Sequence, residues 1–129
     1  MEQNMIVVNF KDQRILKGKT NDFLPNKNRF HLEQIDGSTT DIVVEDLKAI
    51  FFVKDFEGNK NHKDSYNDIL SNAGRKTRAE FIDGETIYGY TLGYSPERQG
   101  FYLTPADLTG NNERIFIVLS STKHVQFVS

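Results

Sequence analysis

Apolar side chains recur at every second position in several short stretches of this 129-residue chain. The alternation is clear in "MIVVNF", "DIVVED" and "KAIFFV". A period of two is typical of half-buried β-strands, because successive side chains of a strand point to opposite faces. The positions expected to point inward are Ile6, Val8, Phe10, Ile42, Val44, Ile50 and Phe52. The pattern therefore predicts a mainly β protein built from short strands.

Turn-forming residues separate the predicted strands. "KDQR" (11–14) and "IDGE" (82–85) are expected to close tight hairpins, and Asp83-Gly84 favours a type I′ turn. Gly18 and Gly89 fall inside predicted strands, which a glycine ordinarily weakens. We therefore expect a sharp bend or bulge at both glycines, of the kind that lets one strand serve two sheets and close a small barrel.

The chain also resembles itself. At a separation of 71 positions, the coinciding pairs are Phe10–Phe81, Asp12–Asp83, Gly18–Gly89, Thr20–Thr91, Pro25–Pro96, Phe30–Phe101 and Leu32–Leu103. After a four-residue insertion the separation becomes 75, which pairs Ile42 with Ile117, Val44 with Leu119, Ile50 with Val125 and Phe52 with Phe127. An internal repeat of this kind predicts two copies of one unit. We expect two tandem five-stranded small barrels, residues 5–53 and 76–128.

A polar segment, residues 54–75, separates the two expected barrels. Ser65 and Asp68 have the spacing of a capping box, and Tyr66, Ile69 and Leu70 lie three and four positions apart. This pattern favours one short amphipathic helix inside the linker.

The order of apolar strands, Asp-Gly turn and glycine-containing strand looks like the small barrels of SH3-like and Sm-like proteins. More narrowly, "LKAIFFVKDFEGN" (47–59) and "GYTLGYSPERQGFYLTPADLTGNNERIFIV" (89–118) resemble an uncharacterised bacterial family of such paired repeats. The resemblance covers nearly the whole chain. It implies a fold and carries no activity with it.

Charge and composition exclude several classes of protein. The chain has 16 basic and 18 acidic residues, so no broad field attracts nucleic acid or an anionic membrane. It has no cysteine, which excludes disulfides and thiolate metal sites. No apolar run approaches the roughly 20 residues of a membrane span, and the first residues lack the pattern of a leader. We expect a soluble, cytoplasmic protein.

A tyrosine-rich strand is the main candidate for a contact surface. Tyr88, Tyr90, Leu92 and Tyr94 are expected on one face, where the first half carries Lys17, Lys19, Asn21 and Phe23. Two interpretations stay open. The favoured one packs these rings within the same chain, because two barrels of this size need a shared buried surface. The other is an aromatic platform for a partner protein or a stacked ligand.

Arginines near this strand suggest an anion site. Arg98 and Arg114 are expected on loops, where two guanidinium groups are suited to a phosphate or carboxylate. Each follows a glutamate, however, and most exposed arginines are solvated or weakly paired. "RKTR" (75–78) forms a second basic cluster, which is more typical of a solvated strand start. The candidate binding residues are Tyr88, Tyr90, Leu92, Tyr94, Arg98 and Arg114.

Catalytic and metal signatures are missing from the sequence. His31, His62 and His124 lie far apart without the ligand spacing of a zinc motif, and His31 is expected to point outward from a strand. Ser95 lacks a nucleophile elbow, and the turn explains the carboxylates of Asp83 and Glu85. We therefore expect no enzyme, no metal and no cofactor.

These observations favour a non-enzymatic bacterial module for protein interaction or ligand sensing, with a protein as the expected partner. The alternative is an Sm-like RNA-binding protein whose tyrosines stack on bases. The cations expected on its phosphates are Lys17, Lys19, Arg75, Lys76 and Arg78. Self-association is left open.

Overall fold

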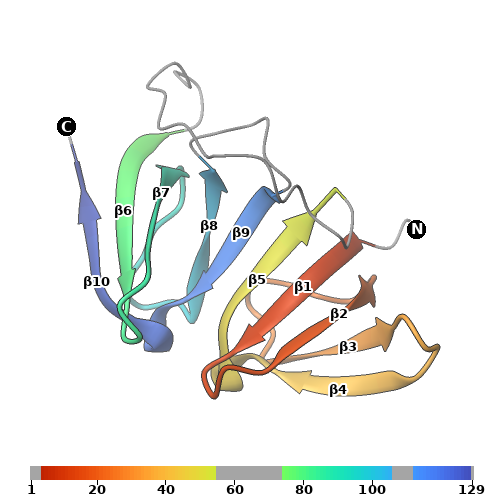
Figure 1. Ribbon diagram of the computed structural model, residues 1–129. Helices are drawn as coiled ribbons and strands as arrows, with labels where there is room; N and C mark the ends of the chain where they lie inside the picture. The colour runs from red at the N-terminus through yellow and green to blue at the C-terminus, as the bar shows by residue number, and fades with distance from the viewer. Residues whose placement is uncertain (1–3, 55–73, 106–111, 129) are drawn as a thin grey trace, which may run out of the picture.

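The computed structural model describes residues 4–54, 74–105 and 112–128, and these residues form a ten-stranded antiparallel sheet with two short 3-10 turns (Figure 1). The mainly β prediction is confirmed. The expected helix of the linker lies outside the described residues. The elements are β1 (Asn4–Phe10), β2 (Ile15–Thr20), β3 (Arg29–Gln34), β4 (Thr39–Val43), η1 (Val44–Asp46), β5 (Leu47–Val53), β6 (Arg75–Phe81), β7 (Thr86–Thr91), β8 (Gly100–Pro105), β9 (Asn112–Val118), η2 (Leu119–Ser121) and β10 (Thr122–Phe127).

The two halves of the chain have the same strand order. The whole sheet runs β10-β6-β7-β8-β9-β5-β1-β2-β3-β4, so the first half reads β5-β1-β2-β3-β4 and the second reads β10-β6-β7-β8-β9. The starts of β1, β2 and β3 are separated from those of β6, β7 and β8 by the first spacing of the sequence repeat. The starts of η1 and β5 are separated from those of η2 and β10 by the second, longer spacing. Positions related by the repeat therefore occupy equivalent places in the sheet.

The two halves join in one continuous sheet, a pairing that the expectation of two tandem barrels did not include. β5 pairs with β9 in antiparallel register, with Ala49 opposite Ile117 and Phe51 opposite Ile115. The two strands lie side by side in the middle of the molecule (Figure 1). Both have apolar residues on both faces, so each strand is stabilised by packing on its two sides.

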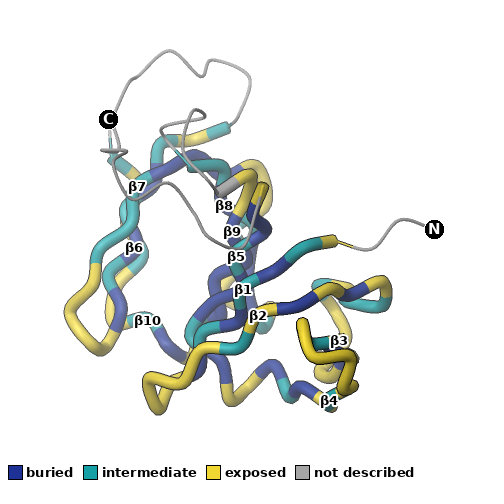
Figure 2. Tube along the Cα trace, turned by 45° about the vertical axis from the view of Figure 1, so that its right-hand side comes forward, coloured by how far each residue is buried: buried dark blue, intermediate teal, exposed yellow. Residues whose placement is uncertain are grey.

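The paired strands β5 and β9 form a wall shared by two hydrophobic cores. Ile50 and Phe52 of β5 join Phe116 and Val118 of β9 in the first core, which β1 to β5 otherwise build. Ala49 of β5 joins Ile115 and Ile117 of β9 in the second core. Buried residues accordingly run along both strands (Figure 2). Each half completes its core with side chains from the other.

The turns follow the predicted positions, but one differs in type. Gly84 has a φ of 95° and its N–H donates to the carbonyl of Phe81 at 2.9 Å. Asp83 does not have a positive φ, so the turn is a three-residue loop with one left-handed residue and not the expected type I′ turn. Gln13 holds the equivalent position in the first half, with a φ of 80°.

A close approach between strands explains the glycine of β2. A Cβ atom on Gly18 would overlap the carbonyl oxygen of Glu33 on β3. β2 pairs with β1 along its length but with β3 only at Gly18 and Lys19. Gly89 is equally close to the carbonyl oxygen of Thr104. The glycines thus let each second strand pass from one neighbour to the next.

Candidate functional site

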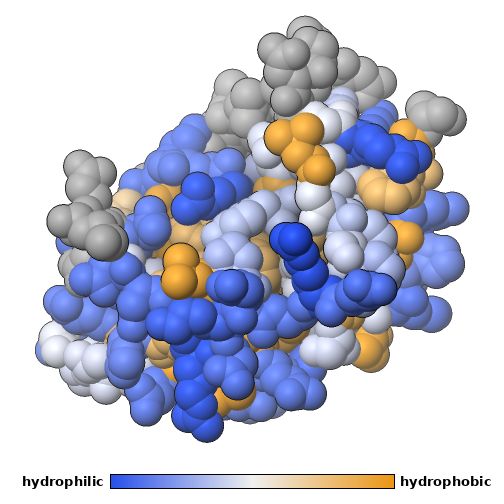
Figure 3. Space-filling model, turned by 180° about the vertical axis from the view of Figure 1, so that it is seen from behind, coloured by the Kyte–Doolittle hydropathy of each residue, from blue (hydrophilic) through white to orange (hydrophobic). Residues whose placement is uncertain are grey.

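A groove near the junction of the two halves collects several predicted binding residues. It encloses about 330 Å³ and its lining includes Pro25, Tyr90, Leu92, Arg98, Tyr102 and Thr104. We call it the Leu92 groove. The face seen from behind is mostly hydrophilic, with its hydrophobic groups in small separate patches (Figure 3).

Two loops border the Leu92 groove and are tied together by a side chain. The loop after β2 contributes Pro25, and the equivalent loop after β7 contributes Leu92 and Arg98. Gln99 donates from Nε2 to the carbonyl of Pro25 at 2.8 Å and to that of Lys27 at 2.6 Å. An adjoining hollow of about 590 Å³ shares Pro25 and Arg98. The hydrogen bonds fix the two loops at the distance that leaves the groove open.

The tyrosine-rich segment does not form one exposed platform. Leu92 follows the end of β7 and is 82% exposed, whereas Tyr90 is only 6% exposed. Tyr94 packs edge-on against Phe101 with ring centroids 5.2 Å apart, as part of the second core. Tyr88 is half-buried on β7. The structure therefore brings Tyr90, Leu92 and Arg98 together, and it places Tyr94 in the packing of the chain itself.

The two arginines occupy different settings. Arg98 lies on the loop as expected, and no carboxylate among the described residues lies within ion-pair distance of its guanidinium. Arg114 lies on β9 and not on a loop, because the strand begins at Asn112. Its guanidinium carbon stacks 4.3 Å from the ring centroid of Phe52 and 5.1 Å from that of Tyr102. Burial raises the pKa of the Tyr102 hydroxyl, which Arg114 only partly offsets.

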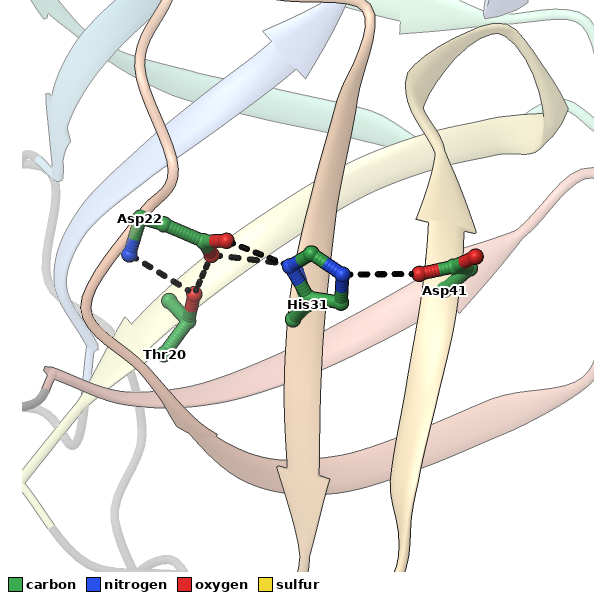
Figure 4. Close-up of polar contacts among 4 residues, drawn as sticks. All are labelled: Thr20, Asp22, His31 and Asp41. Carbon is green, nitrogen blue, oxygen red and sulfur yellow. Dashed lines mark hydrogen bonds and ion pairs between the residues drawn. The ribbon is translucent and has the colours of Figure 1, made fainter.

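A histidine held between two carboxylates is a feature that the sequence reasoning missed. His31 on β3 has Nδ1 2.6 Å from Oδ2 of Asp22 and Nε2 3.0 Å from Oδ1 of Asp41 (Figure 4). Asp22 also accepts a hydrogen bond from the backbone N–H of His31 at 2.9 Å and one from the hydroxyl of Thr20 at 3.0 Å. We call this set the His31 clamp. His31 and Asp41 lie opposite one another because β3 and β4 pair in the register that places Phe30 opposite Ile42. In the sequence, the apolar side chains of Phe30 and Ile42 were the available signal for this register.

The charges of the His31 clamp favour the protonated ring. The hydrogen bond to Asp22 raises the pKa of His31. Partial burial raises the pKa of Asp22, but the hydrogen bonds from His31 outweigh this effect and the net pKa is lowered. Both ring nitrogens already face a carboxylate, so neither is available to act as a general base. The side chain of His31 is 62% exposed, in agreement with the expectation that it points outward.

A second polar cluster, centred on Lys48, connects the two halves of the chain. Lys48 of β5 bonds to Asp83 at 2.7 Å and to Glu85, and its Nζ lies 4.8 Å from the ring centroid of Phe81. Burial lowers the pKa of Lys48, but its bonds to the two carboxylates outweigh burial and the net pKa is raised. Ser121 donates to the carbonyl of Lys48 at 2.8 Å. Asp83 and Glu85 thus do more than form a turn, because they hold the second half on the first.

The cations proposed for RNA do not gather on one strand or one neighbouring pair. Lys17 and Lys19 lie on β2, whereas Arg75, Lys76 and Arg78 lie on β6, and five strands separate β2 from β6 in the sheet. Arg75 stacks 3.8 Å from the ring centroid of Phe127. Arg78 lies 3.6 Å from Glu80. The structure agrees with a partly solvated strand start at residues 75–78.

Two further observations concern metals and membranes. Within residues 4–54, 74–105 and 112–128, no three histidine, aspartate or glutamate side chains gather in a way that would hold a metal ion. The same residues include no helix with the length and apolar character that a bilayer crossing needs.

The fold and the Leu92 groove define an all-β protein with a candidate binding surface at the junction of its two halves. Residues 2–129 match a protein family described as a family of unknown function, DUF6982, and the chain belongs to that family. No curated protein and no solved structure matches the chain.

Proposed function

We propose that this protein is a non-enzymatic bacterial module that binds a segment of a partner protein in the Leu92 groove. The observation that carries the proposal is the exposure of Leu92, 82%, beside a hollow of about 330 Å³. A concave surface lined mainly by apolar and aromatic side chains, with a few polar groups, is typical of a contact for an apolar group of another molecule.

The lining of the groove indicates the chemistry of the ligand. The half-buried ring of Tyr102 and the exposed side chain of Leu92 offer aromatic and apolar surface, and Arg98 supplies a positive charge without a carboxylate partner among the described residues. Aromatic and arginine side chains are the residues most enriched at protein interfaces. We expect a peptide segment that places an apolar side chain in the groove and a carboxylate on Arg98.

A selection from a displayed peptide library tests this proposal. We expect the protein to select peptides in which an apolar residue neighbours an acidic one. Replacing Leu92 by Asp is expected to weaken binding of the selected peptide at least about tenfold, which corresponds to about 1.4 kcal/mol. Fluorescence anisotropy of a labelled peptide measures the change.

Ile35→Asp is the matched control, because Ile35 is also a strongly exposed apolar residue, 69%, but lies in the turn between β3 and β4. This control is expected to bind the peptide like the unmodified protein. Tyr90→Ser is a poorer probe, since the buried ring of Tyr90 also supports the fold. Equal losses in Leu92→Asp and Ile35→Asp would refute binding at the groove.

We infer that the two halves descend from one five-stranded unit of the SH3-like or Sm-like kind, copied within the chain. The equal strand order, and the recurrence of both spacings of the sequence repeat in the starts of equivalent elements, support this inference. The alternative of RNA binding predicts a steep loss of affinity for single-stranded RNA as salt rises. The distance in the sheet between the cations of β2 and those of β6 speaks against it.

A further inference from the structure

The two outermost strands of the sheet suggest a way in which copies of the chain would add to one another. In the described part of the chain, β4 and β10 each pair on one side only. β4 is equivalent to β9, and β10 is equivalent to β5. If a second copy repeated the β5–β9 register, Gln126 would lie opposite Thr40, and Val125 opposite Asp41. Such a head-to-tail contact leaves an edge free at each end and therefore propagates into rings or filaments.

In the first half, however, the place equivalent to the one that holds Lys48 is already occupied by a side chain of the same half. At the internal junction, Lys48 reaches across to Asp83 and lies over the ring of Phe81. The equivalents of Asp83 and Phe81 in the first half are Asp12 and Phe10, and both are taken by Arg14. The Nε of Arg14 bonds to Oδ2 of Asp12 at 2.8 Å, and its guanidinium carbon lies 4.4 Å from the centroid of Phe10.

Arg14 also reverses a charge at this place. It stands where the second half has Glu85, one of the two carboxylates that hold Lys48. The equivalent of Lys48 on the outer strand is Lys123. A repeated junction would therefore bring Lys123 against a site in which an arginine already occupies the carboxylate and the ring. Like charges at such short range oppose the contact.

The outer strand β4 carries a second obstacle. The equivalent of Asp41 is Phe116, which is fully buried at the junction against Phe23 and Tyr102, with centroid distances of 5.0 and 5.3 Å. In a repeated junction Asp41 would take that place beside His31, the equivalent of Tyr102, with which it pairs at 3.0 Å. Burying this exposed charged pair, in a place that two aromatic rings fill at the internal junction, costs the hydration of both charges and is unfavourable.

The outer strand β10 carries the third obstacle. Ala49, whose side chain is fully buried in the shared wall, has His124 as its equivalent. Phe51 has Gln126 as its equivalent. His124 and Gln126 are both exposed. A larger polar ring in the place of a buried methyl group both overfills the contact and loses its hydration.

We infer that Arg14, Asp41 and His124 close the outer strands to a second copy of this chain, so that the junction of β5 with β9 forms once and within one molecule. The first half thus contains an autoinhibitory contact, since Arg14 holds the place that a lysine of a neighbouring copy would need.

Disulfide trapping tests this inference directly, because the chain contains no cysteine of its own. Thr40→Cys and Gln126→Cys are introduced together, at positions that face one another in a repeated junction. Directly opposite residues of antiparallel strands are close enough for a disulfide. In the otherwise unmodified chain, we expect oxidation to give no more intermolecular dimer than either single cysteine gives. In the background Arg14→Glu, Asp41→Phe, His124→Ala, we expect at least about a tenfold increase in cross-linked dimers and larger species.

Sedimentation velocity without the cysteines gives a second measurement. The unmodified chain is expected to sediment as a 14.8 kDa monomer up to about 0.5 mM, a concentration at which an association with a Kd near 1 mM is visible. Circular dichroism reports whether the triple variant folds. If it does not, Arg14→Glu and His124→Ala, which both replace exposed residues, are combined without Asp41→Phe and are expected to give a smaller increase in cross-linking. Efficient trapping in the unmodified background, or a folded variant that stays monomeric, overturns the inference.

Discussion

The strand pairs β3–β4 and β8–β9 hold the same position in their halves and yet face different surroundings. His31 lies opposite Asp41, and Tyr102 lies opposite Phe116. Both pairs are neighbours of core residues that scarcely differ, because Phe30 faces Ile42 in one half and Phe101 faces Ile117 in the other. The inward residues therefore build the unit, and the outward residues decide whether that unit meets water or another half.

The largest expected effect comes from breaking the aromatic member of this comparison. Phe116→Ala removes a fully buried ring that packs against Phe23 and Tyr102. We expect a loss of about 3–5 kcal/mol in the free energy of unfolding, which is the range for phenylalanine to alanine in a core. Urea denaturation followed by circular dichroism measures it.

Asp41→Ala is the matched variant in the first half. Its carboxylate pairs with His31 at the surface, where such pairs contribute at most about 1 kcal/mol. We expect a loss within that limit. Similar losses for Phe116→Ala and Asp41→Ala would contradict the assignment of one pair to a core and the other to the surface.

An intermediate effect is expected from the polar contacts of the junction. Lys48 is 13% exposed and binds Asp83 and Glu85, so Lys48→Met leaves two carboxylates without their cation. We expect a loss of about 1–2 kcal/mol, because both carboxylates keep partial contact with water. Lys123→Met, at the equivalent exposed position, is expected to change the free energy of unfolding by less than about 0.5 kcal/mol. A loss for Lys123→Met as large as that for Lys48→Met would show that Lys123 has a partner of its own.

The smallest effect concerns pH and the His31 clamp. The pKa of His31 is raised above its ordinary value of 6.5, chiefly by its hydrogen bond to Asp22. Its contribution to stability is therefore complete below the unfolded pKa and is lost as pH rises through the folded pKa. We expect the urea midpoint to decrease from about pH 6 to about pH 8, and His31→Gln to lack this decrease. A slope that persists in His31→Gln would assign it to another group.

Much of the strand framework was predictable because the inward positions alternate. Ile6 and Val8 are fully buried, as the period of two required, and both spacings of the sequence repeat recur in the strand bounds. The continuous sheet was not predictable in the same way. Phe51 and Phe116 read as ordinary members of apolar strands, and nothing in their spacing says that they lie against the other half.

The candidate site was predictable only in part. Leu92 and Arg98 do lie together at the groove, because both fall on the loop that follows β7. Tyr94 does not, since the chain turns after Thr91 and the ring of Tyr94 enters the second core. The Lys48 cluster joins residues distant in sequence, and the His31 clamp joins a loop residue to two paired strands, so the folded chain is needed to bring these charges within hydrogen-bond reach.

The shared wall of β5 and β9 has a consequence for folding. Cutting the chain between the halves would leave Ala49 and Phe51 of one fragment, and Phe116 and Val118 of the other, facing solvent. Neither fragment would retain a complete interior, so autonomous folding is not expected of either. The molecule should melt in a single cooperative transition, and a proteolytic nick between the halves should leave the two pieces associated until both denature together.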